Sequence, residues 1–164
     1  MIYYLDMDGV LCDFDGQCQR LLGYKMEPHE NVTQYMERND ICKRDFWEAV
    51  RVHGETFWST MPVLPNGIEA YHQLCQLGRV VILSSPDMNN YDECKAGKEK
   101  WLQKYLGPGK VDARFTPNKY TFADEFAVLI DDNLDQCLYW EQYKGKAILF
   151  NGDWRHVFKQ LGKL

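Results

Sequence analysis

Two aspartates in the stretch IYYLDMDGVLCDF are spaced so that they could act together, because a single residue separates them at the end of an apolar run. Asp6 and Asp8 lie where a buried strand should end and the chain should reach the surface, and Gly9 follows them directly. Two like charges side by side are tolerated best around a bound cation, so the pair indicates a metal site. An Asp-Gly step after a strand is also a common simple turn, and the pair alone does not decide between the two interpretations.

Polar side chains also follow two other apolar runs of the chain. Ser84 and Ser85 follow one run, and Asp131 and Asp132 follow another. If these runs are adjacent parallel strands, their carboxyl ends bring four carboxylates and two hydroxyls into one crevice. The mutual repulsion would raise the pKa of some carboxylates unless a hard divalent cation lay among them, and Mg²⁺ suits oxygen ligands of this kind. The matching strand ends therefore favour a magnesium site over a simple turn.

Short continuous apolar runs predict four buried strands, at residues 2–5, 80–83, 127–130 and 147–150. Continuous rather than alternating runs are typical of parallel strands that are covered on both faces. Helical patterns lie between them, at residues 67–77, 96–106 and 134–143. The alternation of strand and helix predicts an α/β fold, with a doubly wound and mostly parallel sheet.

Residues 17–61 interrupt this alternation, because they contain no convincing strand and are rich in charged, aromatic and helix-compatible residues. We interpret them as a small helical cap inserted after the first strand. Pro62, Pro65 and the pair Asn66-Gly67 mark the return to the core. The predicted organisation is a core domain of residues 1–16 and 62–164 with a cap of residues 17–61.

The composition limits the partners that this protein can have. The 164 residues carry a formal net charge of −5 and no run rich in lysine or arginine, so a long nucleic acid is a poor candidate partner. A small phosphorylated ligand fits better, because one lysine or one metal ion can make a local positive site. No leader-like or membrane-spanning run is present, and we expect a cytoplasmic protein without a membrane partner. The sequence leaves a homodimer open.

Six cysteines are scattered along the chain without a CxxC pair. This spacing suggests neither a disulfide framework nor a zinc site, so we expect free thiols that pack as small hydrophobic side chains.

The three strand ends resemble the motifs of the haloacid dehalogenase-like phosphohydrolases. DMDGVLCDF is similar to their nucleophile motif, VVILSS to their second motif and AVLIDD to their fourth. The resemblance implies that Asp6 attacks phosphorus and forms an aspartyl phosphate, and that Asp8 acts as the general acid and base. It also implies a metal site that contains Asp6, Asp8 and Asp132, with Asp131 beside it, although the order of Asp131 and Asp132 could be reversed.

The same resemblance assigns residues to the phosphate. Ser84 would hold a phosphate oxygen, with Ser85 in support. A lysine is also needed to stabilise the charge of the transition state. Lys119, in TPNKYTF, is the better candidate for it, and Lys98 is the alternative and could also reach the phosphate.

Softer motifs resemble the 5'(3')-deoxyribonucleotidases within this superfamily. The similar segments are Phe14, the FW pair at 46–47, FWSTMPVLPNG at 57–67, ILSSP at 82–86 and WLQKYLG at 101–107. In such enzymes the cap selects the leaving group, and aromatic rings can stack on a base. Phe14, Phe46, Trp47 and Trp58 are therefore candidate substrate contacts, with packing of the cap's own core as the alternative.

The leading hypothesis is a Mg²⁺-dependent phosphomonoesterase of nucleoside monophosphates, with 5'(3')-deoxyribonucleotides as substrates. A 3'-phosphatase of polynucleotides and a phosphatase of another small metabolite are alternatives within the same chemistry. A phospholigand-binding module without turnover is an alternative of a different class. The presence of Asp8 speaks against that module, because binding alone does not need an acid and base.

Overall fold

Five parallel strands form one sheet in the computed structural model, which describes residues 1–107, 109 and 111–164. The order across the sheet is β3-β2-β1-β4-β5, and every neighbouring pair is parallel. The strands are β1 (Ile2–Leu5), β2 (Arg79–Ser84), β3 (Ala113–Phe115), β4 (Ala127–Asp131) and β5 (Lys146–Leu149). The predicted parallel α/β sheet is confirmed, and all four predicted strands lie within one residue of the observed bounds.

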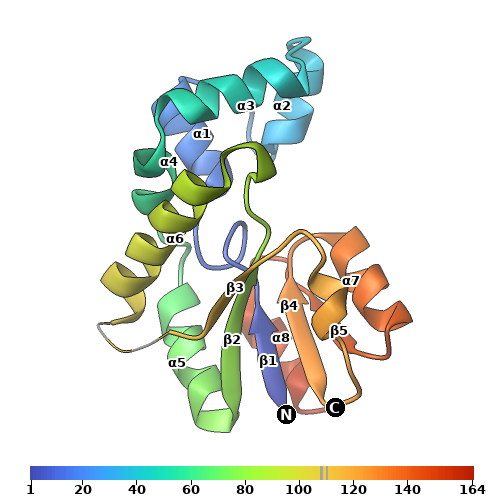
Figure 1. The fold of residues 1–164 in the computed structure, drawn as a ribbon. Helices are drawn as coiled ribbons and strands as arrows, with labels where there is room; N and C mark the ends of the chain where they lie inside the picture. The colour runs from blue at the N-terminus through green and yellow to red at the C-terminus, as the bar shows by residue number, and fades with distance from the viewer. Residues whose placement is uncertain (108, 110) are drawn as a thin grey trace.

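The helices of the core cover both faces of this sheet (Figure 1). They are α5 (Gly67–Leu77), α6 (Tyr91–Leu106), α7 (Leu134–Gln142) and α8 (Trp154–Leu161). The prediction at 67–77 is confirmed residue for residue, and the one at 134–143 is one residue too long. Helix α6 begins five residues before the predicted start, directly after a short 3₁₀ turn, and α8 was not predicted. Pro108, which follows the predicted stop of α6, lies outside the described residues.

Alternating side chains of the central strands enter two separate cores. Tyr3 and Leu5 of β1 pack in the larger core, together with residues of α5, α6 and α8. Tyr4, between them, packs in the smaller core with Trp140 of α7. Burial on both faces explains why these strands are continuous apolar runs in the sequence.

Four helices follow β1 and gather beyond the carboxyl ends of the strands (Figure 1). They are α1 (Phe14–Leu22), α2 (Val32–Arg38), α3 (Lys43–Val52) and α4 (Glu55–Ser59). Helix α1 begins at Phe14, three residues before the predicted start of the cap, because Asp13 caps its first turn by accepting from the Gly16 N–H. The division into a core and a cap at residues 17 and 61 stays a prediction.

Helix α4 packs very closely against α6, which follows β2 in the chain. A Cβ atom added to Gly97 of α6 would lie 2.5 Å from the Glu55 carbonyl oxygen and 2.6 Å from the Trp58 Cβ. Lys100 of α6 forms an ion pair with Glu55, and the Trp101 indole donates to the Met61 carbonyl at 2.8 Å. Any side chain at residue 97 would therefore push the two helices apart.

We expect Gly97→Ala to lower the free energy of unfolding by about 1–2 kcal/mol. Overpacking costs about 1–3 kcal/mol, while alanine recovers up to about 1 kcal/mol of helix propensity. Denaturation in urea measures the change. Gly162→Ala is the control, because a Cβ there meets nothing closer than 3.7 Å, and it should change stability by less than about 0.5 kcal/mol. Equal stability of the two variants would contradict the close packing of α4 on α6.

The six cysteines are all free thiols, but the expectation that they pack as small hydrophobic side chains is wrong for two of them. Cys12, Cys18, Cys94 and Cys137 are buried, whereas Cys42 and Cys75 are exposed. Within the described part of the chain, no helix has the length and apolarity that a membrane crossing requires.

Candidate active site

A tight turn after β1 presents the first two carboxylates. The Met7 carbonyl accepts hydrogen bonds from the backbone N–H groups of Leu11 at 2.8 Å and Cys12 at 3.0 Å, which folds the chain back on itself. Gly9 lies in this turn with φ 76°, and an added Cβ would collide with the carboxylate of Asp132. Glycine is required at this position for both its backbone conformation and its lack of a side chain.

Strands β1 and β4 bring three carboxylates together. These strands are neighbours, with Leu5 opposite Ile130, so Asp6 and the pair Asp131-Asp132 leave the sheet side by side. One carboxylate oxygen from each of the three aspartates lies within 4.8 Å of the other two. The prediction that these two strand ends converge is thus matched by the geometry.

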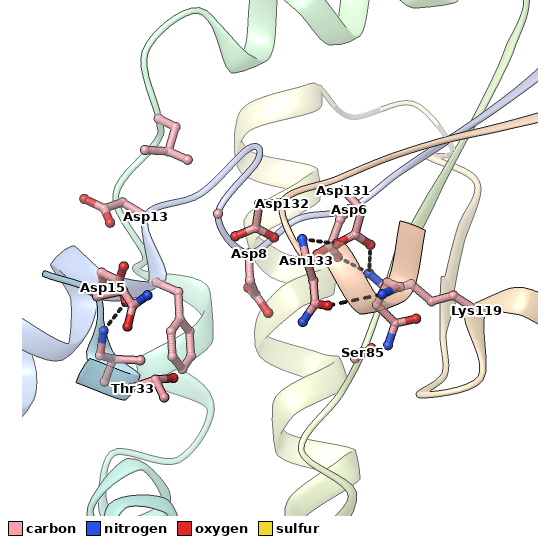
Figure 2. A pocket seen from close by; sticks show the side chains of 16 residues that line it. Asp6, Asp8, Asp13, Asp15, Thr33, Ser85, Lys119, Asp131, Asp132 and Asn133 are labelled. Carbon is pink, nitrogen blue, oxygen red and sulfur yellow. Dashed lines mark hydrogen bonds and ion pairs between the residues drawn. The ribbon is translucent and has the colours of Figure 1, made fainter. Parts of the chain in front are cut away.

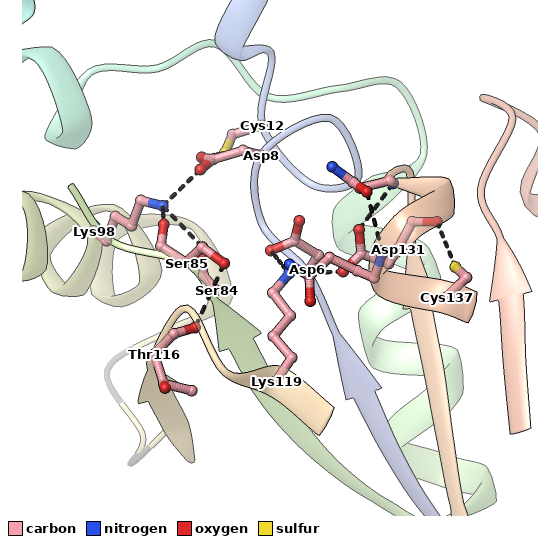
Figure 3. Close-up of polar contacts among 12 residues, drawn as sticks. Asp6, Asp8, Cys12, Ser84, Ser85, Lys98, Thr116, Lys119, Asp131 and Cys137 are labelled. Atoms are coloured by element: carbon pink, nitrogen blue, oxygen red, sulfur yellow. Dashed lines mark hydrogen bonds and ion pairs between the residues drawn. The ribbon is translucent and has the colours of Figure 1, made fainter. Parts of the chain in front are cut away.

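Lys119 is the cation inside this group of carboxylates. It begins a short 3₁₀ helix, η2 (Lys119–Phe122), and its side chain is buried. Its Nζ lies 2.8 Å from Oδ1 of Asp6 and 2.7 Å from Oδ2 of Asp131 (Figure 3). Burial alone would lower the pKa of Lys119, but the two carboxylates outweigh it and raise that pKa.

The three carboxylates carry more negative charge than one lysine can balance. Burial and then the charge of Asp6 raise the pKa of Asp131 to about 6. The same two causes, in the same order, raise the pKa of Asp132 to about 7, although the residue as a whole is open to the pocket. The buried Oδ1 of Asp6 lies near Lys119 but has no hydrogen bond of good geometry. A crowded set of oxygen ligands with an unpartnered atom fits a hard divalent cation.

Lys98 forms a second buried polar group around Asp8. From α6, its Nζ donates to Oδ2 of Asp8 at 2.6 Å, to the Ser84 hydroxyl at 2.8 Å and to the Ser85 carbonyl at 3.1 Å (Figure 3). It also lies 4.9 Å from the ring centre of Trp58. Burial lowers the pKa of Lys98 and Asp8 raises it, with a net increase. Lys98 therefore links Asp8 to the end of β2.

A cavity of about 580 Å³ opens over these groups, at the carboxyl ends of the strands (Figure 2). Seven of the predicted site residues line it, namely Asp6, Asp8, Phe14, Ser85, Lys119, Asp131 and Asp132. Ser84 and Lys98 lie behind the wall, fully buried.

The aromatic candidates divide in the same way, because only Phe14 lines the cavity. Phe46 and Trp58 are 3% and 2% exposed and pack against the Phe14 ring, with ring centres 6.3 and 6.0 Å away. Trp47 packs on the same cluster, 4.9 Å from Phe46. The arrangement agrees with the alternative in which these rings are packing residues, although they join the larger core of the protein and do not form a separate core of the cap.

Several lining residues were not singled out from the sequence: Asp13, Asp15, Asn31, Val32, Thr33, Leu64, Asn133 and Gln136. A signal for two of them was present, because Asp13 and Asp15 repeat the spacing of the first aspartate pair seven residues later. The others lie at the starts of α2 and α7, apart from Leu64, which lies between α4 and α5. No local pattern marks them as neighbours of the first strand.

A comparison with models of protein families gives a match over residues 1–161, to the model described as 5' nucleotidase, deoxy (pyrimidine), cytosolic type C protein. The human cytosolic type 5'(3')-deoxyribonucleotidase is 26% identical over 121 residues, which cover 66% of this chain and 59% of that protein. The human mitochondrial 5'(3')-deoxyribonucleotidase is 26% identical over 148 residues, which cover 80% and 61%. The chain thus spans about 60% of the length of these curated relatives.

Solved structures with the same fold are hydrolases. A hydrolase from Streptococcus pneumoniae TIGR4 superposes with a TM-score of 0.59 at 12% identity, covering 98% of this chain and 97% of the other. A HAD family enzyme from Bacteroides thetaiotaomicron, crystallised with magnesium and inorganic phosphate, gives 0.56 at 16% identity, covering 96% and 98%. At these identities the superpositions establish the fold. It is the fold expected from the resemblance of DMDGVLCDF, VVILSS and AVLIDD to the motifs of haloacid dehalogenase-like phosphohydrolases.

Proposed function

Because the chain belongs to the family of 5' nucleotidase, deoxy (pyrimidine), cytosolic type C proteins, we propose that it hydrolyses nucleoside monophosphates as a phosphomonoesterase. The proposed substrates are 5'(3')-deoxyribonucleotides. The observation that carries the proposal is the convergence of Asp6, Asp131 and Asp132 around Lys119 at one end of an open cavity. The names of the two human relatives support the choice of substrate.

In the proposed mechanism, Asp6 attacks the phosphorus atom and the bond to the leaving oxygen breaks. The product of this step is an aspartyl phosphate on Asp6. Asp8 gives a proton to the leaving oxygen and later takes one from the water that hydrolyses the aspartyl phosphate. Lys119, whose Nζ is 2.8 Å from Asp6, is placed to offset the negative charge of the phosphoryl group in the transition state.

Asp6, Asp131 and Asp132 would hold Mg²⁺, with the backbone carbonyl of Asp8 as a further ligand. When bound, the ion neutralises phosphate charge and so makes attack by a carboxylate feasible. The phosphate would contact Lys119 and Ser85 at the cavity wall. Ser84 and Lys98 would act from behind, by fixing Asp8 and the end of β2.

The proposal also covers the size of the substrate, the location of the protein and its oligomeric state. The protein acts on small substrates rather than on long nucleic acids, as its net charge of −5 indicates. A cytoplasmic location is supported by the cytosolic type relative. A homodimer is compatible with the chain.

A panel of phosphate esters tests the proposal. Deoxyuridine and thymidine monophosphates, as 5' and 3' isomers, should release phosphate with Mg²⁺ present, and a chelator should reduce the rate at least about 100-fold. A 3'-phosphorylated oligonucleotide should be a poor substrate. Magnesium should also raise the unfolding temperature, because it relieves the crowding of the carboxylates.

Each alternative has its own outcome in this panel. Preference for the oligonucleotide would favour the polynucleotide 3'-phosphatase, and preference for a phosphate ester without a base would favour another metabolite. Absence of phosphate release from every ester, including p-nitrophenyl phosphate, would favour the binding module and contradict the proposed function.

A further inference from the structure

The cavity has a second end, which lies beyond Asp8 as seen from Lys119 (Figure 2). Asp13, Asp15 and Thr33 lie at this end (Figure 2), and Phe14, between the two aspartates in the sequence, also lines the cavity. In the proposed reaction the phosphate occupies the end with Lys119, so the leaving group must extend toward these residues. Their charges therefore act on the leaving group and not on the phosphate.

The two ends differ in how their carboxylates are balanced. Asp6 and Asp131 share Lys119, and Asp8 pairs with Lys98. Asp13 and Asp15 have no lysine, arginine or histidine nitrogen within 4.0 Å among the described residues. Lys119 is the one basic residue among the described residues that line the cavity.

Each of these two carboxylates is held in place by the backbone. One Asp13 oxygen accepts from the Gly16 N–H at 2.7 Å, and one Asp15 oxygen accepts from the Val32 N–H at 3.0 Å. Asp15 thus connects the start of α1 to the start of α2 while it faces the cavity. Its charge is fixed at this end and cannot swing away from an approaching anion.

We propose that Asp15 is a specificity-determining residue that excludes leaving groups with a second anionic group. This inference rests on the proposed function. The end near Lys119, with its metal site, can neutralise one phosphate, whereas a second phosphate would face two carboxylates without a cation. At short range in a partly buried site, like charges repel strongly enough to discriminate between such substrates. The favoured leaving group is uncharged and carries hydroxyl or amino donors for the carboxylates, with a flat ring for Phe14.

Asp15→Asn is the informative change. The asparagine carboxamide oxygen can still accept from the Val32 N–H, so the connection between α1 and α2 is kept while the charge is lost. Asp13 is less suitable, because it caps α1. Asp92→Asn is the matched control, since Asp92 is exposed, has no ion pair or side-chain hydrogen bond in the described structure, and does not line the cavity.

The experiment compares kcat/KM for deoxyuridine 5'-monophosphate and deoxyuridine 3',5'-bisphosphate at low ionic strength. The wild type should prefer the monophosphate by about 100-fold or more. Asp15→Asn should reduce this ratio by about tenfold, which corresponds to about 1.4 kcal/mol, mainly through a lower KM for the bisphosphate. Added salt should lower the preference for the monophosphate over the bisphosphate, measured as the ratio of their kcat/KM values. The decrease should be larger in the wild type than in Asp15→Asn.

The outcomes separate this inference from the proposed function. If the wild type hydrolyses both nucleotides equally well, or if Asp15→Asn keeps the wild-type ratio, the inference fails and the nucleotidase activity stands. An equal shift in Asp92→Asn would also overturn it, because the effect would then come from net charge alone. If neither nucleotide is hydrolysed, both the proposed function and the inference fall. Unfolding curves of the three proteins should coincide within about 0.5 kcal/mol.

Discussion

Replacing Asp6 with asparagine is expected to abolish turnover, with a loss of at least about 10⁴-fold, and to leave the fold intact. The asparagine amide has almost the same volume as the carboxylate but is not a competent nucleophile toward phosphorus. Asp6 also lies in a group of three carboxylates around one lysine. Removal of one negative charge from that group relieves repulsion, so the unfolding temperature in a chelator should be equal to or higher than that of the wild type.

Phosphate release from a nucleoside monophosphate measures the loss, and thermal unfolding measures the fold. The exposed Asp92→Asn variant makes the same chemical change at a residue that does not line the cavity and should retain wild-type turnover. Substantial activity in a well-folded Asp6→Asn protein would exclude the covalent mechanism. Trapping of phosphate on the wild-type chain by rapid acid quench, and its absence in the variant, would support that mechanism directly.

Asp8→Asn is expected to lower kcat by about 10²–10⁴-fold with little change in KM. The side chain accepts from Lys98 at 2.6 Å, and an amide oxygen can accept the same hydrogen bond, so the local geometry should persist. What the asparagine cannot do is give a proton to the leaving oxygen. The loss should be smallest for p-nitrophenyl phosphate, because a good leaving group departs without a proton, and largest for a nucleoside monophosphate.

Steady-state kinetics with both esters test this role. A variant in which KM alone rises would mean that Asp8 contributes to binding and not to proton transfer. An equal loss with both leaving groups would contradict its action as a general acid. Unchanged binding of inorganic phosphate would show that the phosphate site has survived the substitution.

The sheet could be predicted from the sequence because its central strands are buried on both faces. Such strands need continuous apolar runs, and the four that were expected are present within one residue of their bounds. Strand β3 escaped prediction because it is only three residues long, lies at the edge of the sheet and contains the exposed Arg114. Helix α8 escaped because it has only eight residues, which gives a helical pattern little length in which to show.

The site could be predicted only in part. Residues at the ends of adjacent strands are brought together by the topology itself, so Asp6 and Asp131 could be paired from the sequence. The bonding of Lys98 to Asp8 could not, because it depends on how α6 crosses the end of β2. Phe46 and Trp58 show the same limit, since an aromatic residue can line a cavity or fill a core, and the packing of the helices decides which. Their roles toward a substrate stay predictions.

The close packing of α4 on α6 also bears on how this protein could be re-engineered. Gly97 presses against the backbone of Glu55, and the next residue along α6, Lys98, holds Asp8. A graft that rebuilt α4 would therefore also disturb the hydrogen bond between Lys98 and Asp8, which lies well away from α4 in the sequence.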